Sequence, residues 1–115
     1  MSDSREDQIE RLRVVLEQLR REQRTMTYLE AADSIPLDPP HRIHQVARLL
    51  EFMLEQDCLT HRPKLAALVV SRVRGGLPAP GFFDWARRLG LYDGRDPARF
   101  HRELLDQLYQ DDPNP

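Results

Sequence analysis

The stretch LVVSRVRGGLPAPGFF, residues 68–83, decides the fold because it joins an apolar run to a glycine pair and a proline-rich return. The run LAALVV, residues 65–70, is short and ends in paired valines, which favours a buried strand over a helix. Gly75 and Gly76 allow positive φ and predict that the chain reverses direction there, as at a hairpin tip. Pro78 cannot donate to a β-ladder and would keep the returning strand at an edge. The stretch therefore predicts one small β-hairpin.

Helical periodicity dominates the sequence before this hairpin. Thr27 followed by Glu30 has the capping-box spacing and predicts a short helix over TYLEAADSI. A longer helix is expected next, with Asp38 as its N-cap, a proline in its first turn and Pro63 beyond its end. Its apolar face recurs at spacings of three and four residues, through Ile43, Val46, Ala47, Leu50, Met53 and Leu54.

Two further helices are predicted after the glycine pair. GFFDWARRLG forms a short aromatic helix that stops at Gly90. Asp96 caps a last helix that Pro97 opens, with an apolar stripe at Phe100, Leu104 and Leu108. The predicted fold class is thus α+β and mostly helical, with a winged-helix-like core of helices plus one small β-hairpin.

The N-terminal segment is predicted to be a heptad helix that precedes this core. Its apolar seam consists of Ile9, Leu12, Leu16 and Leu19. So narrow a stripe on a short helix is marginal alone and needs a surface to pack against. We expect a two-chain coiled coil, hence a homodimer, with docking on the helix's own domain as the alternative. The predicted organisation is residues 1–26 for this helix, 27–110 for a globular domain and 111–115 for a disordered tail.

Composition limits the classes of protein that the chain can belong to. Its 115 residues suffice for a single core, and 40% apolar with 31% charged residues predict a folded chain with a charged surface. No apolar run approaches the roughly 20 residues that span a bilayer, and the N-terminus lacks a secretory pattern, so we expect a cytoplasmic protein without a membrane partner. The lone Cys58 cannot form an internal disulfide and is expected to be a small buried thiol.

Candidate catalytic and metal-binding residues are isolated from one another. His41 and His44 share a helical face, but a structural zinc site needs four ligands, and His61 lies too far along the helix to join them. Ser71 follows the apolar run without a Gly-x-Ser-x-Gly elbow or an assignable base. The sequence therefore predicts no enzymatic activity, no metal and no cofactor.

The order of short helix, proline-containing link, longer helix and glycine-rich tip is that of a winged helix. A recognition helix presents polar residues of its first turns to base edges, while arginines on a hairpin tip contact phosphate or the minor groove. We therefore predict a non-enzymatic protein that binds double-stranded DNA, although its formal net charge is −2. The predicted nucleic-acid-binding residues are His41, Arg42, His44, Gln45, Arg48, Arg72 and Arg74. If these residues do not share one face, the arginines serve only to make the surface soluble.

TYLEAA followed by a helix and then by LAALVVSRVRGGLPAPGF resembles the winged-helix DNA-binding part of alkylguanine-DNA alkyltransferases and alkyltransferase-like proteins. The run is also similar to small bacterial proteins. Residues 68–70 match the family's apolar strand, and Arg72-Val73 match the arginine and valine after its reactive site. Ser71 stands where the family has Pro-Cys-His, so the resemblance implies DNA binding without alkyl transfer.

The alternative function is a protein-interaction module, an adaptor or inhibitor that does not bind nucleic acid. It would use the heptad helix and the exposed parts of PAPGFFDW, residues 78–85, since aromatic residues often anchor protein interfaces. Phe82 and Trp85 are also spaced as core residues of a helix, and we expect both to be mainly buried.

Overall fold

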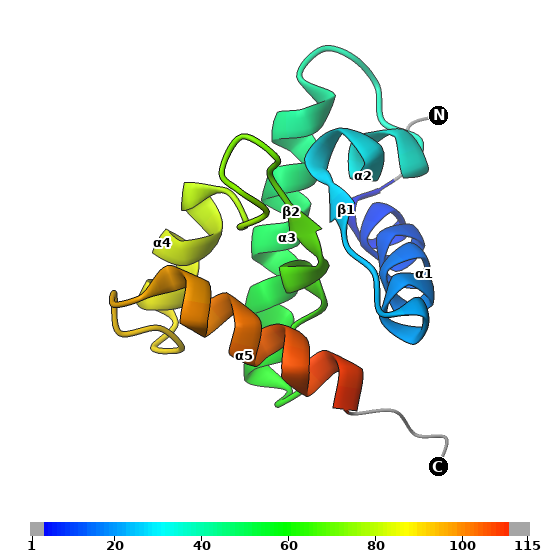
Figure 1. Ribbon diagram of the computed structural model, residues 1–115. Coiled ribbons are helices and arrows are strands. Elements are labelled where there is room, and N and C mark those ends of the chain that lie inside the picture. Colours follow the sequence, from blue (N-terminus) through cyan, green and yellow to red (C-terminus); the bar gives the residue numbers. More distant parts are fainter. Residues whose placement is uncertain (1–3, 111–115) are drawn as a thin grey trace.

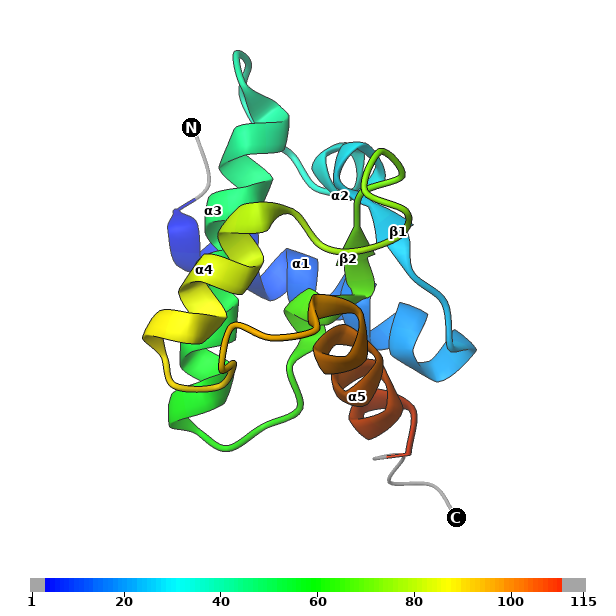
Figure 2. The same ribbon diagram turned by 60° about the vertical axis from the view of Figure 1, so that its left-hand side comes forward.

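The computed structural model describes residues 4–110, which form a mostly helical α+β fold around a two-stranded sheet (Figure 1 and Figure 2). The long helix α3 runs through the molecule, with α4 on one side and α1 and α2 on the other (Figure 1). The elements are α1 (Arg5–Glu22), β1 (Met26–Thr27), α2 (Tyr28–Ser34), α3 (Arg42–Leu59), the 3-10 helix η1 (Leu65–Leu68), β2 (Val69–Val70), α4 (Pro80–Arg88) and α5 (Pro97–Gln110). Within residues 4–110, none of the helices combines the length and the apolar character needed to cross a membrane. The predicted tail, residues 111–115, lies outside the described residues.

The apolar run at residues 65–70 lies in the centre of the core, and only its last two residues form a strand. Residues 65–68 wind into η1, whereas β2 pairs in parallel with β1. The predicted strand is therefore wrong for the first four residues of the run. All six residues are buried and η1 packs against α1, α3 and α5, so helices rather than strands surround it. The backbone is satisfied locally instead, as where the Ala67 amide donates to the Lys64 carbonyl at 3.0 Å.

The predicted hairpin is reduced to a closed loop over residues 71–77, which we call the 71–77 loop. Ser71 and Leu77 form one antiparallel bridge, in which the Ser71 amide donates to the Leu77 carbonyl at 2.8 Å. Gly75 and Gly76 have φ values of 68° and 87°, which confirms the positive φ predicted for the glycine pair. The chain then continues into α4 without a longer returning strand.

The start of α3 differs from the prediction that placed its N-cap at Asp38. The helix begins at Arg42 with His41 as its N-cap. A following proline disfavours helical backbone in the residue before it, so Pro40 excludes Pro39 from the helix. His41 has φ 66°, a left-handed conformation that turns the chain into α3 after both prolines.

α1 packs on its own domain. Its seam residues, which are at most 5% exposed, are Ile9, Leu12, Leu16 and Leu19. They belong to the same apolar cluster as the buried residues of α3, η1 and α5. The prediction that these four side chains face a second chain is therefore wrong, because the chain's own core already covers them, and the docked alternative holds. A homodimer through another surface stays a prediction.

Three other helix-end signals of the sequence are confirmed, at the start of α2, the end of α4 and the start of α5. In the capping box of α2, Thr27 Oγ1 accepts from the Glu30 amide at 3.1 Å and Glu30 Oε1 accepts from the Thr27 amide at 2.9 Å. Gly90 follows α4 with φ 79°. At the start of α5, Asp96 Oδ1 accepts from the Arg99 amide at 3.1 Å. Each of these contacts joins residues three apart, so the local sequence is enough to specify it.

The aromatic residues of α4 face the core. Phe82 and Phe83 are buried and meet edge to face, with 5.4 Å between ring centroids. Trp85 is half-buried, and the Arg88 guanidinium lies over its ring at 5.4 Å from the centroid. The prediction that Phe82 is mainly buried is confirmed, and PAPGFFDW therefore offers little aromatic surface to a partner.

Candidate functional site

A groove of about 940 Å³ lies between α2, the first turns of α3 and the 71–77 loop. We call it the α2–α3 groove. Its walls come from residues 27–30, from the beginning of α3 and from the tip of the loop, and Ala79 and Pro80 complete it. The loop stands beside α2 at the same end of the molecule (Figure 2). Segments far apart in the sequence thus build one concave surface.

Aliphatic side chains line this groove although they are open to solvent. Leu29 is 53% exposed, Ile43 is 48% exposed and Val73 is 96% exposed. They are three of the five large hydrophobic residues that are exposed within residues 4–110. Solvent-exposed apolar side chains that gather in one concavity mark binding surfaces more often than the same residues scattered singly.

Four of the seven residues predicted to bind nucleic acid line the same groove: His41, His44, Arg72 and Arg74. The two histidines belong to the start of α3 and the two arginines to the 71–77 loop, so one surface carries both sets. Within the described chain neither arginine is ion-paired, although Arg74 Nε donates to the Pro78 carbonyl at 3.2 Å. Glu30 is the carboxylate of the lining. Its pKa lies below the ordinary value, chiefly because the Thr27 amide donates to it, and Arg72 adds a smaller effect.

The other three predicted residues do not line the groove. Arg42 Nη2 lies 2.9 Å from an Asp33 carboxylate oxygen, and this pair ties α3 to α2. Gln45 Nε2 donates to the Asp38 and Pro40 carbonyls at 2.7 and 2.8 Å. Arg48 is exposed further along α3. Arg42 and Gln45 thus hold the link between α2 and α3, a role that the sequence did not reveal.

The 71–77 loop is held in shape by its own hydrogen bonds. The amides of Arg74 and Gly76 both donate to the Ser71 carbonyl, at 3.2 and 3.0 Å. The Gly75 amide donates to the Arg72 carbonyl at 3.0 Å. Beneath the loop, the Tyr28 hydroxyl accepts from the Ala79 amide at 2.9 Å, and burial raises the pKa of this phenol. The loop therefore presents its exposed side chains from a fixed backbone.

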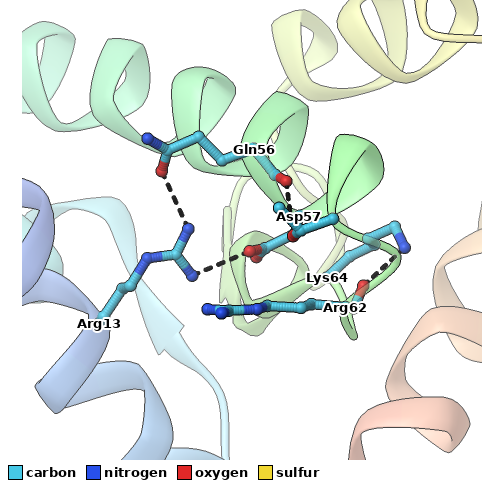
Figure 3. A network of polar contacts seen from close by, with 6 residues as sticks. Arg13, Gln56, Asp57, Arg62 and Lys64 are labelled. Atoms are coloured by element: carbon cyan, nitrogen blue, oxygen red, sulfur yellow. Dashed lines mark hydrogen bonds and ion pairs between the residues drawn. The ribbon is translucent and has the colours of Figure 1, made fainter.

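A second cavity, of about 450 Å³, lies between α1 and the C-terminal end of α3 and contains a buried carboxylate. Asp57 is 1% exposed, and Arg13 Nη1 lies 2.9 Å from its Oδ1 (Figure 3). The other terminal nitrogen of Arg13 donates to Gln56 Oε1 at 3.0 Å. Burial raises the pKa of Asp57, and the nearby guanidinium opposes that effect. The sequence signal was the register of Asp57, which continues the apolar face of α3 from Leu50 and Met53.

Within residues 4–110, His101 is a second buried ionisable residue that the sequence did not reveal. It is 5% exposed, and its Nε2 lies 2.8 Å from the Ala67 carbonyl oxygen of η1. Burial lowers the pKa of its imidazole, and the hydrogen bond to the carbonyl opposes the shift. His101 lies three residues before Leu104 on the buried stripe of α5, and its contact with η1 gives it a structural role.

The remaining candidates for chemistry are separate from one another. Among residues 4–110 no group of three or more histidine, cysteine, aspartate and glutamate side chains is placed to hold a metal ion. Ser71 is half-buried in the bridge with Leu77, and Cys58 is half-buried rather than fully buried as expected. Comparisons with models of protein families, with curated proteins and with solved structures find no match for this chain. The resemblance to alkyltransferase-like proteins stays a prediction from the sequence.

Proposed function

We propose that the protein is a non-enzymatic protein-interaction module that binds a segment of a partner protein in the α2–α3 groove. The observation that carries this proposal is the gathering of Leu29, Ile43 and Val73, all open to solvent, in one concave surface. The energy of protein interfaces comes mainly from a few apolar or aromatic side chains that are buried against complementary pockets.

The closed conformation of the 71–77 loop supports the same function. Val73 is 96% exposed in a loop that five backbone hydrogen bonds already order, from the amides of Ser71, Arg74, Gly75, Gly76 and Leu77. A binding surface that is ordered before the partner arrives avoids part of the entropy cost of association. The exposed valine is therefore suited to anchor a partner.

Selection of a random peptide library displayed on phage against the purified chain tests this proposal. We expect enriched peptides to lose about tenfold or more in affinity for Val73→Asp and Ile43→Asp, because a carboxylate would replace an apolar contact. Matched controls are Val14→Asp and Leu59→Asp, which change aliphatic residues that are also exposed but lie outside the groove. Absence of enriched peptides, or equal affinity for all four variants, would overturn the proposal.

Binding of double-stranded DNA by a winged-helix-like core is the second candidate. It is favoured by one observation: His41, His44, Arg72 and Arg74 line one groove. In this case α3 is the recognition helix and the 71–77 loop is the wing. The aliphatic side chains of the lining favour the first candidate instead, since duplex DNA presents mainly phosphates and base edges.

Titration of a labelled DNA duplex at several salt concentrations tests the second candidate. The double variant Arg72→Ala, Arg74→Ala should bind more weakly, and the salt slope should fall by about one for each arginine that contacts a phosphate. Arg95→Ala with Arg102→Ala is the matched control, because both arginines are exposed and lie outside the groove. An unchanged affinity and slope in the first variant would exclude this mechanism.

A further inference from the structure

We infer that the partner segment is acidic as well as aliphatic, with its apolar side chains on Leu29, Ile43 and Val73 and its carboxylates on Arg72 and Arg74. This inference rests on the proposed function and names the chemistry of the partner. It follows from the order of side chains on the 71–77 loop, where an exposed valine stands between two exposed arginines.

The two arginines are available to an acidic partner. Within residues 4–110 neither is ion-paired, and the single hydrogen bond of Arg74 uses Nε alone. Its terminal nitrogens remain as donors, and their fixed fork matches the two oxygens of a carboxylate. The bond to the Pro78 carbonyl also restrains the side chain, which reduces the entropy lost when a partner binds.

Glu30, the acidic residue of the lining, does not cancel the positive charge of Arg72 and Arg74. Glu30 accepts from the Thr27 amide at 2.9 Å within the capping box, so its carboxylate already has a partner at the start of α2. Arg72 contributes only a small part of the lowering of the Glu30 pKa. With two arginines against one glutamate, the lining carries a net positive charge and is complementary to negative charge.

The dimensions of the groove limit the size of the occupant. Its volume of about 940 Å³ is that of a site for a few side chains or a small molecule. A short segment that places two or three aliphatic residues in the groove fills it, with adjacent carboxylates at the loop. A DNA duplex would satisfy the arginines but would cover the three aliphatic residues with a polar backbone.

The test uses the peptides that are selected on the full chain and measures how their acidic residues affect affinity. We expect enriched peptides to combine aliphatic residues with Asp or Glu, and Glu→Gln versions to bind several-fold more weakly. The double variant Arg72→Glu, Arg74→Glu should bind the acidic peptides at least about tenfold more weakly, since two attractive pairs become repulsive. The same variant should regain affinity for peptides in which Lys replaces Glu. A matched control, Arg95→Glu with Arg102→Glu, carries the same change of net charge elsewhere.

Two outcomes overturn the inference in different ways. Peptides that depend on Val73 but bind equally well after Glu→Gln would refute the acidic partner while leaving the proposed function intact. A DNA duplex that binds more tightly than every peptide, loses affinity in the Arg72→Glu, Arg74→Glu variant and ignores Val73→Asp would refute both. Circular dichroism of each variant establishes that it is folded before its binding is measured.

Discussion

Residues 65–70 and residues 71–77 are neighbours in sequence but have opposite environments. Each residue of the first segment is at most 7% exposed, and helices enclose it on several sides. The tip of the second segment is exposed, and its contacts are mostly hydrogen bonds within itself. The buried packing and the exposed surface that we propose for recognition thus belong to adjacent but separate pieces of chain. Substitutions can test how complete the separation is.

The largest expected effect is loss of stability at the buried segment. Leu68→Ala removes a side chain that is 0% exposed and leaves a cavity, which costs about 2–5 kcal/mol of unfolding free energy. Denaturant unfolding measures this, with Val73→Ala in the exposed segment as the control that should change stability by less than about 0.5 kcal/mol. Equal losses in the two variants would contradict the separation.

A smaller loss is expected where the buried segment begins. Leu65 lines the cavity that contains the Arg13–Asp57 ion pair. Arg13→Ala leaves the carboxylate buried without its partner and, because Arg13 itself is partly exposed, should cost about 1–3 kcal/mol in denaturant unfolding. Arg21→Ala is the control, because its exposed guanidinium lines the same cavity without contacting Asp57. A loss in Arg13→Ala no greater than in the control would show that the ion pair contributes nothing.

A substitution that restricts the backbone of the 71–77 loop should affect both stability and peptide binding. Gly76 has φ 87° and nothing within 4 Å of an added Cβ, so Gly76→Ala strains the backbone without a clash. We expect a loss of about 1 kcal/mol in unfolding free energy, together with weaker binding of groove peptides. If peptide affinity stays unchanged while stability falls, the fixed shape of the loop is not needed for recognition.

The smallest effect concerns pH. Burial raises the pKa of Asp57 in the folded chain, so the folded state keeps this proton to higher pH than the unfolded state does. Its contribution to unfolding free energy therefore falls as pH rises from about the ordinary value of 3.8 to the raised pKa. Asp57→Asn should lose this pH dependence. As pH rises through that window, the unfolding free energy of the variant should therefore increase relative to that of the native chain. If the difference in unfolding free energy between Asp57→Asn and the native chain is constant with pH, the pKa of Asp57 is the same in the folded and unfolded states.

Sequence reasoning succeeded where a contact joins near neighbours and failed where distant segments meet. The capping box, the glycine after α4 and the positive φ at Gly75 and Gly76 follow from a few adjacent residues. The 3-10 helix at residues 65–68 does not, because helices brought together by the fold decide its environment. The heptad seam of α1 was identified, yet its spacing could not distinguish a second chain from the chain's own core.

The candidate site was also predicted in part. His41, His44, Arg72 and Arg74 were placed on one surface by the order of elements, and the structure brings them to one groove. The aliphatic residues were missed because periodicity assigned Ile43 to a core face and gave Leu29 and Val73 no role. Val73 carried a readable signal, since an aliphatic residue between two arginines at a glycine-rich turn has no neighbour to pack against.

The bridge between Ser71 and Leu77 brings the entry and exit of the 71–77 loop to within one hydrogen bond of each other. The chain thus leaves the core and returns to it at nearly the same point. The exposed side chains of Arg72, Val73 and Arg74 can therefore be replaced without changing where the loop joins the core. The surface at the tip can consequently vary while the architecture beneath it stays the same.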